Sequence, residues 1–239
     1  EWVIVAAKAT ANPELPEAVA PLLGADTRIL TLQNGMGNAE FFAERFGAGR
    51  ILGGLCFVCI NRTGPARIEN LMRGRVTIGD YTAGRMDRAG AMAARFNEAG
   101  VKCNATASLQ EALWRKLCWN IPFNGLAIAA GGVTTDHLMA SGPLRQLARA
   151  LMEEIRAAAG AEGFAIEEDF LEGQMRVTEG MGAYRPSSLI DYLDGRAVEV
   201  EAIFGEPVRR ARKLGTPMPR AEALHLLIKH LCGVRGGQG

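Results

Sequence analysis

The sequence has little of what marks several large classes of protein. Aromatic residues make up 6% of the 239 residues, and 27 basic residues nearly balance 26 acidic ones, for a formal net charge of +1 without any basic tract. Nucleic-acid-binding proteins usually carry a basic patch, so a nucleic-acid partner is not expected. No apolar run is long enough to span a bilayer, and we expect no membrane partner.

Cysteine is scarce and irregularly spaced. The five cysteines lie at positions 56, 59, 103, 118 and 232, an odd number without the pattern of a secreted disulfide framework. We therefore expect a reducing compartment and a cytoplasmic location. Cys56 and Cys59 form a CxxC within an expected strand, where residues three apart point to opposite faces, and no second pair exists. We predict no metal site.

The beginning of the chain lacks an initiator Met, a charged signal-peptide region and a cleavage site. Glu1 and Trp2 lead directly into a strand-like run. A natural N-terminus rarely opens inside a buried strand, so we expect residues to be missing upstream.

The apolar content of 48% with 22% charged residues is ordinary for a globular protein, and the length allows two cores. Residues 1–107 alternate apolar runs with amphipathic segments, which predicts an α/β domain with the βαβαβ order of the second half of a Rossmann-type dinucleotide-binding domain. No Gly-rich phosphate fingerprint occurs in them. The expected strands are residues 2–7, 28–32, 51–60, 66–71, 75–80 and 101–105, the first buried on both faces and the fourth and fifth forming an antiparallel extension.

From Ser108 onward the pattern predicts helices only. Ser108 and Glu111 form a capping box that opens the first of them. Residues 108–232 therefore form an expected all-α C-terminal domain, and residues 233–239 (GVRGGQG) an expected disordered tail. The apolar C-terminal helices fit a homodimer face as well as a domain core.

One stretch of this helical part carries a polar stripe. Lys116, Asn120 and Asn124 recur every four residues, which places one cation and two carboxamides on one helix face. The opposite face is apolar, with Leu113, Trp114, Leu117 and Cys118 expected in a core. Such groups suit a keto acid, although spacing alone favours a solvated face. Pro122 interrupts the helix and is expected to kink it.

Polar residues also follow two expected strands. Lys8 comes after the first strand, and Asn34, Gly35 and Gly37 come after the second. Ligands of open α/β sheets bind at the carboxyl ends of the strands, so these positions are candidate ligand contacts. The alternative for Asn34-Gly35 is a simple tight turn.

Four landmarks together resemble the 2-dehydropantoate 2-reductases, also called ketopantoate reductases. They are Lys8, QNGMG at residues 33–37, ALWRKLCWNIPFN at 112–124 and SSLIDYLDGRAVE at 187–199. The resemblance covers most of the chain. It implies that a missing N-terminal segment of roughly 60 to 70 residues, about one βαβ unit, carries the phosphate fingerprint.

The resemblance also implies roles for individual residues. Lys116 is the expected general acid, and Asn120, Asn124 and Ser187 are expected to hold a small 2-keto acid. The expected cofactor contacts are Lys8, Asn34, Cys59 and Glu199, with Asn34 between cofactor and substrate. Without the resemblance, Glu199 reads as a helix surface residue beside Arg196. The preference for NADP is likewise implied only by the resemblance.

The implied function is NADPH-dependent reduction of 2-dehydropantoate to (R)-pantoate on the route to pantothenate and coenzyme A. The chain departs from the family at Val198, Glu201, Phe204 and Thr134, which leaves reduction of another small 2-keto acid as an alternative. A non-catalytic dinucleotide-binding sensor is a further alternative. The presence of Lys116 argues against it, because a binding module needs no proton donor.

Overall fold

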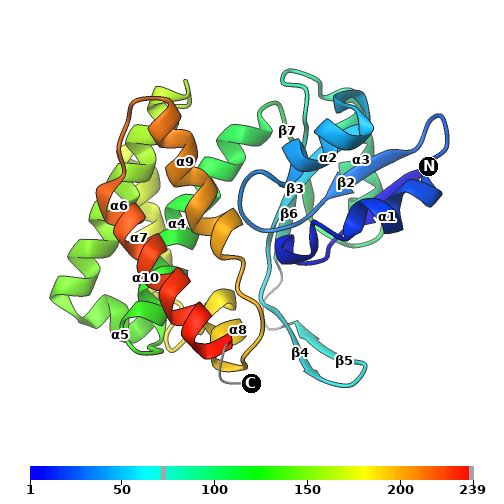
Figure 1. The fold of residues 1–239 in the computed structure, drawn as a ribbon. Coiled ribbons are helices and arrows are strands. Elements are labelled where there is room, and N and C mark those ends of the chain that lie inside the picture. The colour runs from blue at the N-terminus through cyan, green and yellow to red at the C-terminus, as the bar shows by residue number, and fades with distance from the viewer. Residues whose placement is uncertain (71–73, 237–239) are drawn as a thin grey trace. The chain divides into compact units, whose positions relative to one another are not determined.

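The computed structural model of the protein describes residues 1–70 and 74–236. The chain divides into two compact units, Glu1–Ala112 and Leu113–Gly239, and each is described by itself (Figure 1). The first is an α/β unit and the second is helical, which confirms the predicted fold class.

The first unit is built on a five-stranded sheet with the order β1-β2-β3-β6-β7. Its strands are β1 (Trp2–Val5), β2 (Arg28–Thr31), β3 (Ile51–Phe57), β6 (Arg75–Asp80) and β7 (Cys103–Thr106). The first three are parallel, β6 is antiparallel to β3, and β7 is parallel to β6. The carboxyl ends of β1, β2 and β3 therefore lie along the same edge of the sheet.

The two remaining strands form a hairpin of their own. Strand β4 (Ile60–Gly64) pairs antiparallel with β5 (Arg67–Asn70), and β5 does not join the main sheet. The expected strand over residues 51–60 is thus wrong beyond Phe57, and only β6 of the expected two-strand extension pairs with β3. Leu71, the last residue of the expected strand 66–71, lies outside the described residues.

Strand β1 corrects another expectation. It occupies an edge of the described sheet, and Ile4 is 50% exposed, so the strand is not buried on both faces. A strand with an apolar sequence is buried on both faces only when other elements pack against each face. The local sequence does not specify whether they do. The first helix of the connection that follows β1 begins at Leu15, with Pro16 in its first turn.

Helices and short 3₁₀ turns form the segments that connect the strands of the sheet. They are α1 (Leu15–Val19), α2 (Asn38–Phe46) and α3 (Asp87–Glu98), with 3₁₀ turns at Ala9–Ala11, Ala20–Leu22 and Ala48–Arg50. The amphipathic helix α3 places Ala89 and Met92 against Leu30, Leu52 and Ile78 of the sheet. These buried contacts hold α3 against the sheet.

The second unit contains helices and no strand among its described residues. They are α4 (Leu109–Ala129), which begins in the first unit, α5 (Thr135–Ala140), α6 (Gly142–Ala161), α7 (Glu168–Glu179), α8 (Ser187–Leu193), a π-helical turn (Glu201–Gly205), α9 (Glu206–Lys213) and α10 (Pro219–Gly236). Helix α10 continues to Gly236, so the disordered tail expected from residue 233 is wrong for residues 233–236. Residues 237–239 lie outside the described part of the chain.

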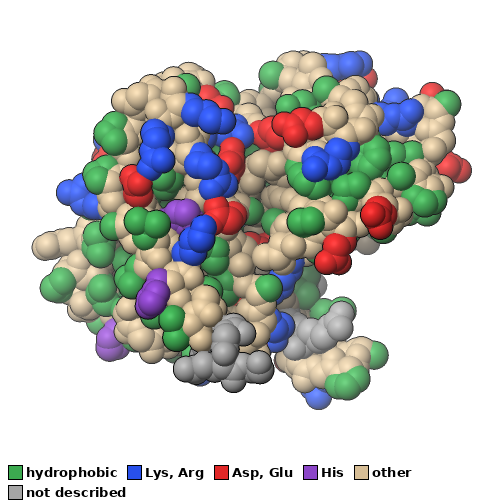
Figure 2. Space-filling view, in the orientation of Figure 1, with side chains coloured by type: hydrophobic (Ala, Val, Ile, Leu, Met, Phe, Trp, Pro, Cys, Tyr) green, Lys and Arg blue, Asp and Glu red, His purple; other side chains and the backbone are tan. Residues whose placement is uncertain are grey.

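The surface of the helical unit carries charges of both signs. On the face shown in Figure 2, acidic and basic side chains are interspersed over it rather than gathered into a patch of one sign. Within the described residues, no helix combines the length and the hydrophobicity needed to cross a membrane.

Candidate functional site

Helix α4 carries the polar stripe and is well anchored. The Ser108 hydroxyl oxygen accepts the backbone N–H of Glu111 at 3.2 Å, which confirms Ser108 as the N-cap. The Trp114 indole N–H donates at 2.6 Å to Glu162, the residue that follows α6. Leu113, Trp114, Leu117 and Cys118 are all buried, as predicted, and burial raises the pKa of the Cys118 thiol to about 12. This apolar face fixes the direction of the opposite one.

The three residues of the stripe are buried as well. Lys116 and Asn120 are each 7% exposed, and Asn124 is 1% exposed. The interpretation of this stripe as a solvated face is therefore wrong. A buried ammonium group and buried carboxamides require polar partners, because loss of their hydration is otherwise unfavourable. Such groups on a rigid helix can orient a polar ligand.

Asn124 is held in one orientation by a residue 64 positions further along the chain. Its side-chain oxygen accepts the backbone N–H of Ser188, in the first turn of α8, at 2.9 Å. Its side-chain nitrogen is buried and has no hydrogen-bond partner within the described part of the chain. Sequence reasoning missed Ser188, because a backbone N–H leaves no signal in the residue type. The predicted Ser187 precedes it and is exposed.

Glu199 is also buried, at 8% exposed. The alternative that placed it on the surface beside Arg196 is wrong, since Arg196 pairs instead with Asp191 at 3.0 Å and Asp194 at 2.6 Å. The π-helical turn begins two residues after Glu199, and the Glu199 carbonyl accepts the N–H of Ile203 at 3.0 Å. Single π-helical turns occur frequently at functional sites.

Two departures from the family pattern have structural roles. Phe204 is fully buried, and its ring lies close to Gly125 of α4. A Cβ atom added to Gly125 would lie 3.0 Å from Cε1 of Phe204. Phe204 therefore packs beneath α4. Thr134 is the N-cap residue of α5 and donates to the Asp136 carboxylate, which lowers the pKa of that carboxyl. Neither position supplies a free polar group.

In the first unit, three predicted residues follow neighbouring parallel strands. Lys8 follows β1, Asn34 follows β2 and Cys59 follows β3, so all three belong to one edge of the sheet. Gly35 and Gly37 have φ angles of 82° and 86°, a left-handed backbone that lets the chain turn from β2 into α2. The chain therefore bends sharply here, and Asn34 lies at the carboxyl edge of the parallel strands.

The CxxC pair is divided between two environments. Cys56 lies within β3 and Cys59 lies beyond its end, so the assumption that both occupy one strand is wrong. The described part of the chain contains no disulfide between its cysteines. Among the described residues, no group of three His, Cys, Asp or Glu side chains could hold a metal ion.

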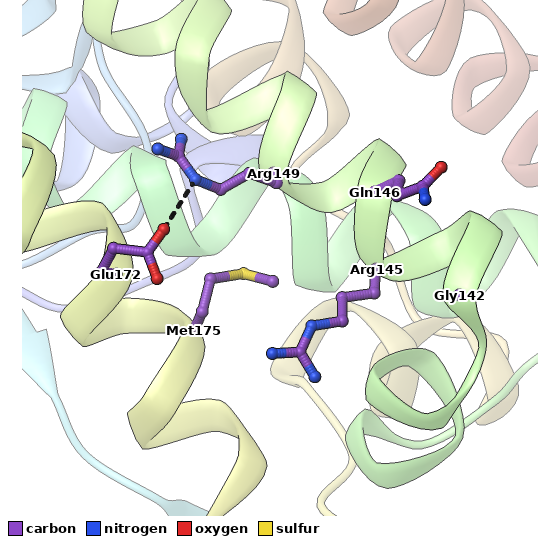
Figure 3. A pocket seen from close by; sticks show the side chains of 6 residues that line it. All are labelled: Gly142, Arg145, Gln146, Arg149, Glu172 and Met175. Atoms are coloured by element: carbon purple, nitrogen blue, oxygen red, sulfur yellow. Dashed lines mark hydrogen bonds and ion pairs between the residues drawn. The ribbon is translucent and has the colours of Figure 1, made fainter.

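A pocket of about 360 Å³ opens between α6 and α7, away from the residues that we predicted. Figure 3 shows the side chains that line it, with Arg149 bonded to Glu172 at 3.3 Å. Arg145 pairs with Glu179 at 2.5 Å. Because its cations are neutralised by protein carboxylates, this pocket is a poor binding site for an anion, and the candidate site stays on α4.

Comparison with known proteins decides the family. Residues 108–231 match the profile of the ketopantoate reductase PanE/ApbA C-terminal family, and residues 1–83 match that of ketopantoate reductase PanE/ApbA. The chain belongs to the ketopantoate reductase family. Its members are oxidoreductases that use nicotinamide dinucleotides, and the resemblance and the prediction of an enzyme are both confirmed.

Individual ketopantoate reductases agree with this assignment. The chain is 38% identical over 236 residues to a 2-dehydropantoate 2-reductase from Nostoc sp., covering 97% of this chain and 74% of that protein. It is 34% identical to the enzyme of the same name from Halobacterium salinarum, covering 84% and 66% of the two chains. The crystal structure of the Geobacter metallireducens 2-dehydropantoate 2-reductase superimposes with a TM-score of 0.92 at 40% identity, covering 96% and 76%.

Proposed function

We propose that the protein reduces 2-dehydropantoate to (R)-pantoate with NADPH, a reaction of pantothenate and coenzyme A biosynthesis, and that Lys116 is its general acid. The observation that carries the proposal is the buried stripe of α4, in which a cation and two carboxamides share one face. The partnerless amide nitrogen of Asn124 is a hydrogen-bond donor available to a substrate oxygen.

The residue types suit reduction of a ketone. Hydride addition leaves negative charge on the ketone oxygen, and a nearby ammonium group stabilises that charge. Lys116 can then donate the proton that completes the alcohol, which an Arg at this position would not do. Asn120, Asn124 and Ser187 are neutral and orient the carboxylate and hydroxyl groups without adding competing charge.

The chemistry of the donor groups fits a nicotinamide dinucleotide, which would supply the hydride. Lys8 offers a cation to a phosphate or ribose oxygen, Asn34 offers a carboxamide, and the Glu199 carboxylate can accept ribose hydroxyl donors. Cys59 is a small, 8% exposed residue at the same sheet edge. The choice of NADP over NAD rests on the family resemblance. A cytoplasmic location and a homodimer both remain predictions.

Steady-state kinetics test the role of Lys116. In the full-length enzyme, Lys116→Ala should lower kcat by about 10²- to 10⁴-fold, the usual contribution of a general acid, while NADPH binding persists. Lys213→Ala, which removes an exposed cation at the end of α9, is the matched control and should turn over normally. Near-normal turnover by Lys116→Ala would refute the assignment.

A panel of 2-keto acids tests the substrate. Phe204 is buried and the Thr134 hydroxyl is bonded to Asp136, so neither departure gives a specific reason to expect a different keto acid. We therefore expect the highest kcat/KM for 2-dehydropantoate. A higher kcat/KM for another keto acid would support the proposed reaction but assign it a different substrate. Tight NADPH binding without turnover of any keto acid would instead favour the non-catalytic sensor.

A further inference from the structure

A directional chain of hydrogen bonds lies at the carboxyl ends of β1 and β2. The Thr31 hydroxyl donates to the Gln33 side-chain oxygen at 2.8 Å, and the Gln33 amide nitrogen donates to the Asn12 oxygen at 2.7 Å. The Asn12 nitrogen donates to the Asn38 oxygen at 2.9 Å. The Asn38 nitrogen donates to the backbone carbonyl of Asn34 at 2.9 Å. We call the side chains of Thr31, Gln33, Asn12 and Asn38 the amide relay.

The relay connects Asn12 to residues 31–38, which lie some 20 positions further along the chain. Thr31 ends β2, Asn12 lies in the connection after β1, and Asn38 is the first residue of α2. Thr31 is 3% exposed, and Gln33 and Asn38 are each 5% exposed. Each carboxamide accepts through its oxygen and donates through its nitrogen, so the orientation of one determines that of the next. Buried polar groups in such a network strengthen one another and specify a single arrangement.

The end point of the relay distinguishes it from an ordinary cross-link. Its last donor bonds the main chain of Asn34, and the next residue and Gly37 both have a left-handed backbone. Glycines give this loop more conformational freedom than other residues would. A bond to the Asn34 carbonyl restrains the loop at the residue whose side chain is assigned to the site.

We propose that the amide relay positions Asn34 for reaction, with Asn12, Gln33 and Asn38 as positioning residues that act through it. The proposal rests on the role given to Asn34 under the proposed function. A small displacement of a group that orients reactants can lower the rate by about 10²-fold, so loss of one bond in the relay should affect catalysis more than folding.

The critical variant is Asn38→Asp in the full-length enzyme. It keeps an acceptor for Asn12 and removes the donor to the Asn34 carbonyl. The new charge lies in the first turn of α2, where a helix tolerates a carboxylate well, so the fold should persist. Asn12→Asp removes the preceding donor and serves as a second variant. Asn104→Asp, on the exposed face of β7, is the matched control and should leave kcat/KM unchanged.

A double-mutant cycle with Asn34→Ala separates positioning from a general structural effect. We expect Asn38→Asp to lower kcat/KM by about 10- to 100-fold when Asn34 is present and to have little effect in the Asn34→Ala background. Equal losses in both backgrounds, or no loss in either, would overturn the proposal. So would full activity of Asn34→Ala. The Lys116→Ala result is independent of this cycle, so failure of the relay and failure of the proposed reaction are distinguishable.

Discussion

The side-chain oxygen of Asn124 accepts the backbone N–H of Ser188 at 2.9 Å, and this bond fixes the carboxamide at a depth where the residue is 1% exposed. Because the oxygen is committed, the nitrogen is the group that Asn124 can offer to a ligand. The orientation of this donor depends on both residues. The helix α4 provides the carboxamide, and the first turn of α8 determines which end of it is available.

Asn124→Asp tests that division of roles. The variant keeps an oxygen for Ser188 and replaces the donor nitrogen with a charged oxygen. Repulsion of the substrate carboxylate should raise KM for 2-dehydropantoate and lower kcat/KM by about 100-fold or more, since juxtaposed like charges cost several kcal/mol. Steady-state kinetics at saturating NADPH measure the effect. Gln146→Glu adds the same charge on the exposed face of α6 and should leave KM unchanged. An unaltered KM in Asn124→Asp would contradict the assignment.

Gly125→Ala tests the packing beneath the stripe. An added Cβ would lie 2.5 Å from Leu224 Cδ2 and 3.0 Å from Phe204 Cε1, and overpacking of this kind usually costs about 1–3 kcal/mol. Helix propensity acts in the opposite direction, by about 1 kcal/mol in favour of Ala. We expect a net loss in the free energy of unfolding, measured by urea denaturation.

Two further variants check this interpretation. Gly160→Ala on α6 meets no atom within 4 Å and should be neutral or stabilising. In a Leu224→Ala background, the damage from Gly125→Ala should diminish, because the closest obstructing atom is gone. Equal stability of Gly125→Ala and Gly160→Ala would show that α4 relaxes freely at this point.

Local patterns predicted the parts of the fold that depend on local physics. The apolar runs located β1 and β2, and Ser108 marked the start of α4 through its capping chemistry. The exposure of Ile4 and the pairing of β4 with β5 were missed, because both depend on which strands become neighbours. Strand order is a property of the whole sheet and has no local signature.

The candidate site shows the same limit. Four-residue spacing placed Lys116, Asn120 and Asn124 on one face, but burial of that face depends on elements far along the chain. Long-range hydrogen bonds join Asn124 to a residue 64 positions away and Asn12 to one 26 positions away. Spacing rules describe neighbours within one helix or strand. They do not describe contacts that form only after the elements pack.

Glu154→Ala tests how α10 is anchored. The Glu154 side chain, on α6 and 8% exposed, accepts the backbone N–H groups of Arg220 at 3.0 Å and Ala221 at 2.9 Å. These donors lie in the first turn of α10 and have no partner within the helix. Leaving them unpaired should lower the free energy of unfolding by about 1–3 kcal/mol. The neighbouring Glu153→Ala removes more exposed ion pairs and should cost about 0–1 kcal/mol. Equal effects would exclude a capping role for Glu154.

Glu201 connects the π-helical turn to two helices. Its carboxylate accepts hydrogen bonds from Arg209 at 2.6 Å and Lys229 at 3.0 Å, and it lies 3.2 Å from Nε2 of His225. Burial opposes ionisation of this carboxyl, but the hydrogen bonds with Arg209, Lys229 and His225 outweigh burial and lower its pKa to about 2. Glu201 is therefore charged in the folded protein even in moderately acidic solution.

Glu201→Gln should change how stability depends on pH. Because the pKa of Glu201 is lower in the folded state than its ordinary value of 4.5, the ionised carboxylate stabilises the folded protein above about pH 4.5, and this contribution is lost as the pH falls toward about 2. Tm should therefore be higher for the wild type than for Glu201→Gln at neutral pH, and the difference should shrink below about pH 4.5. Scanning calorimetry of both proteins across this range measures it. A difference in Tm that stays constant down to the acid limit would show that packing, rather than ionisation, accounts for the effect of the substitution.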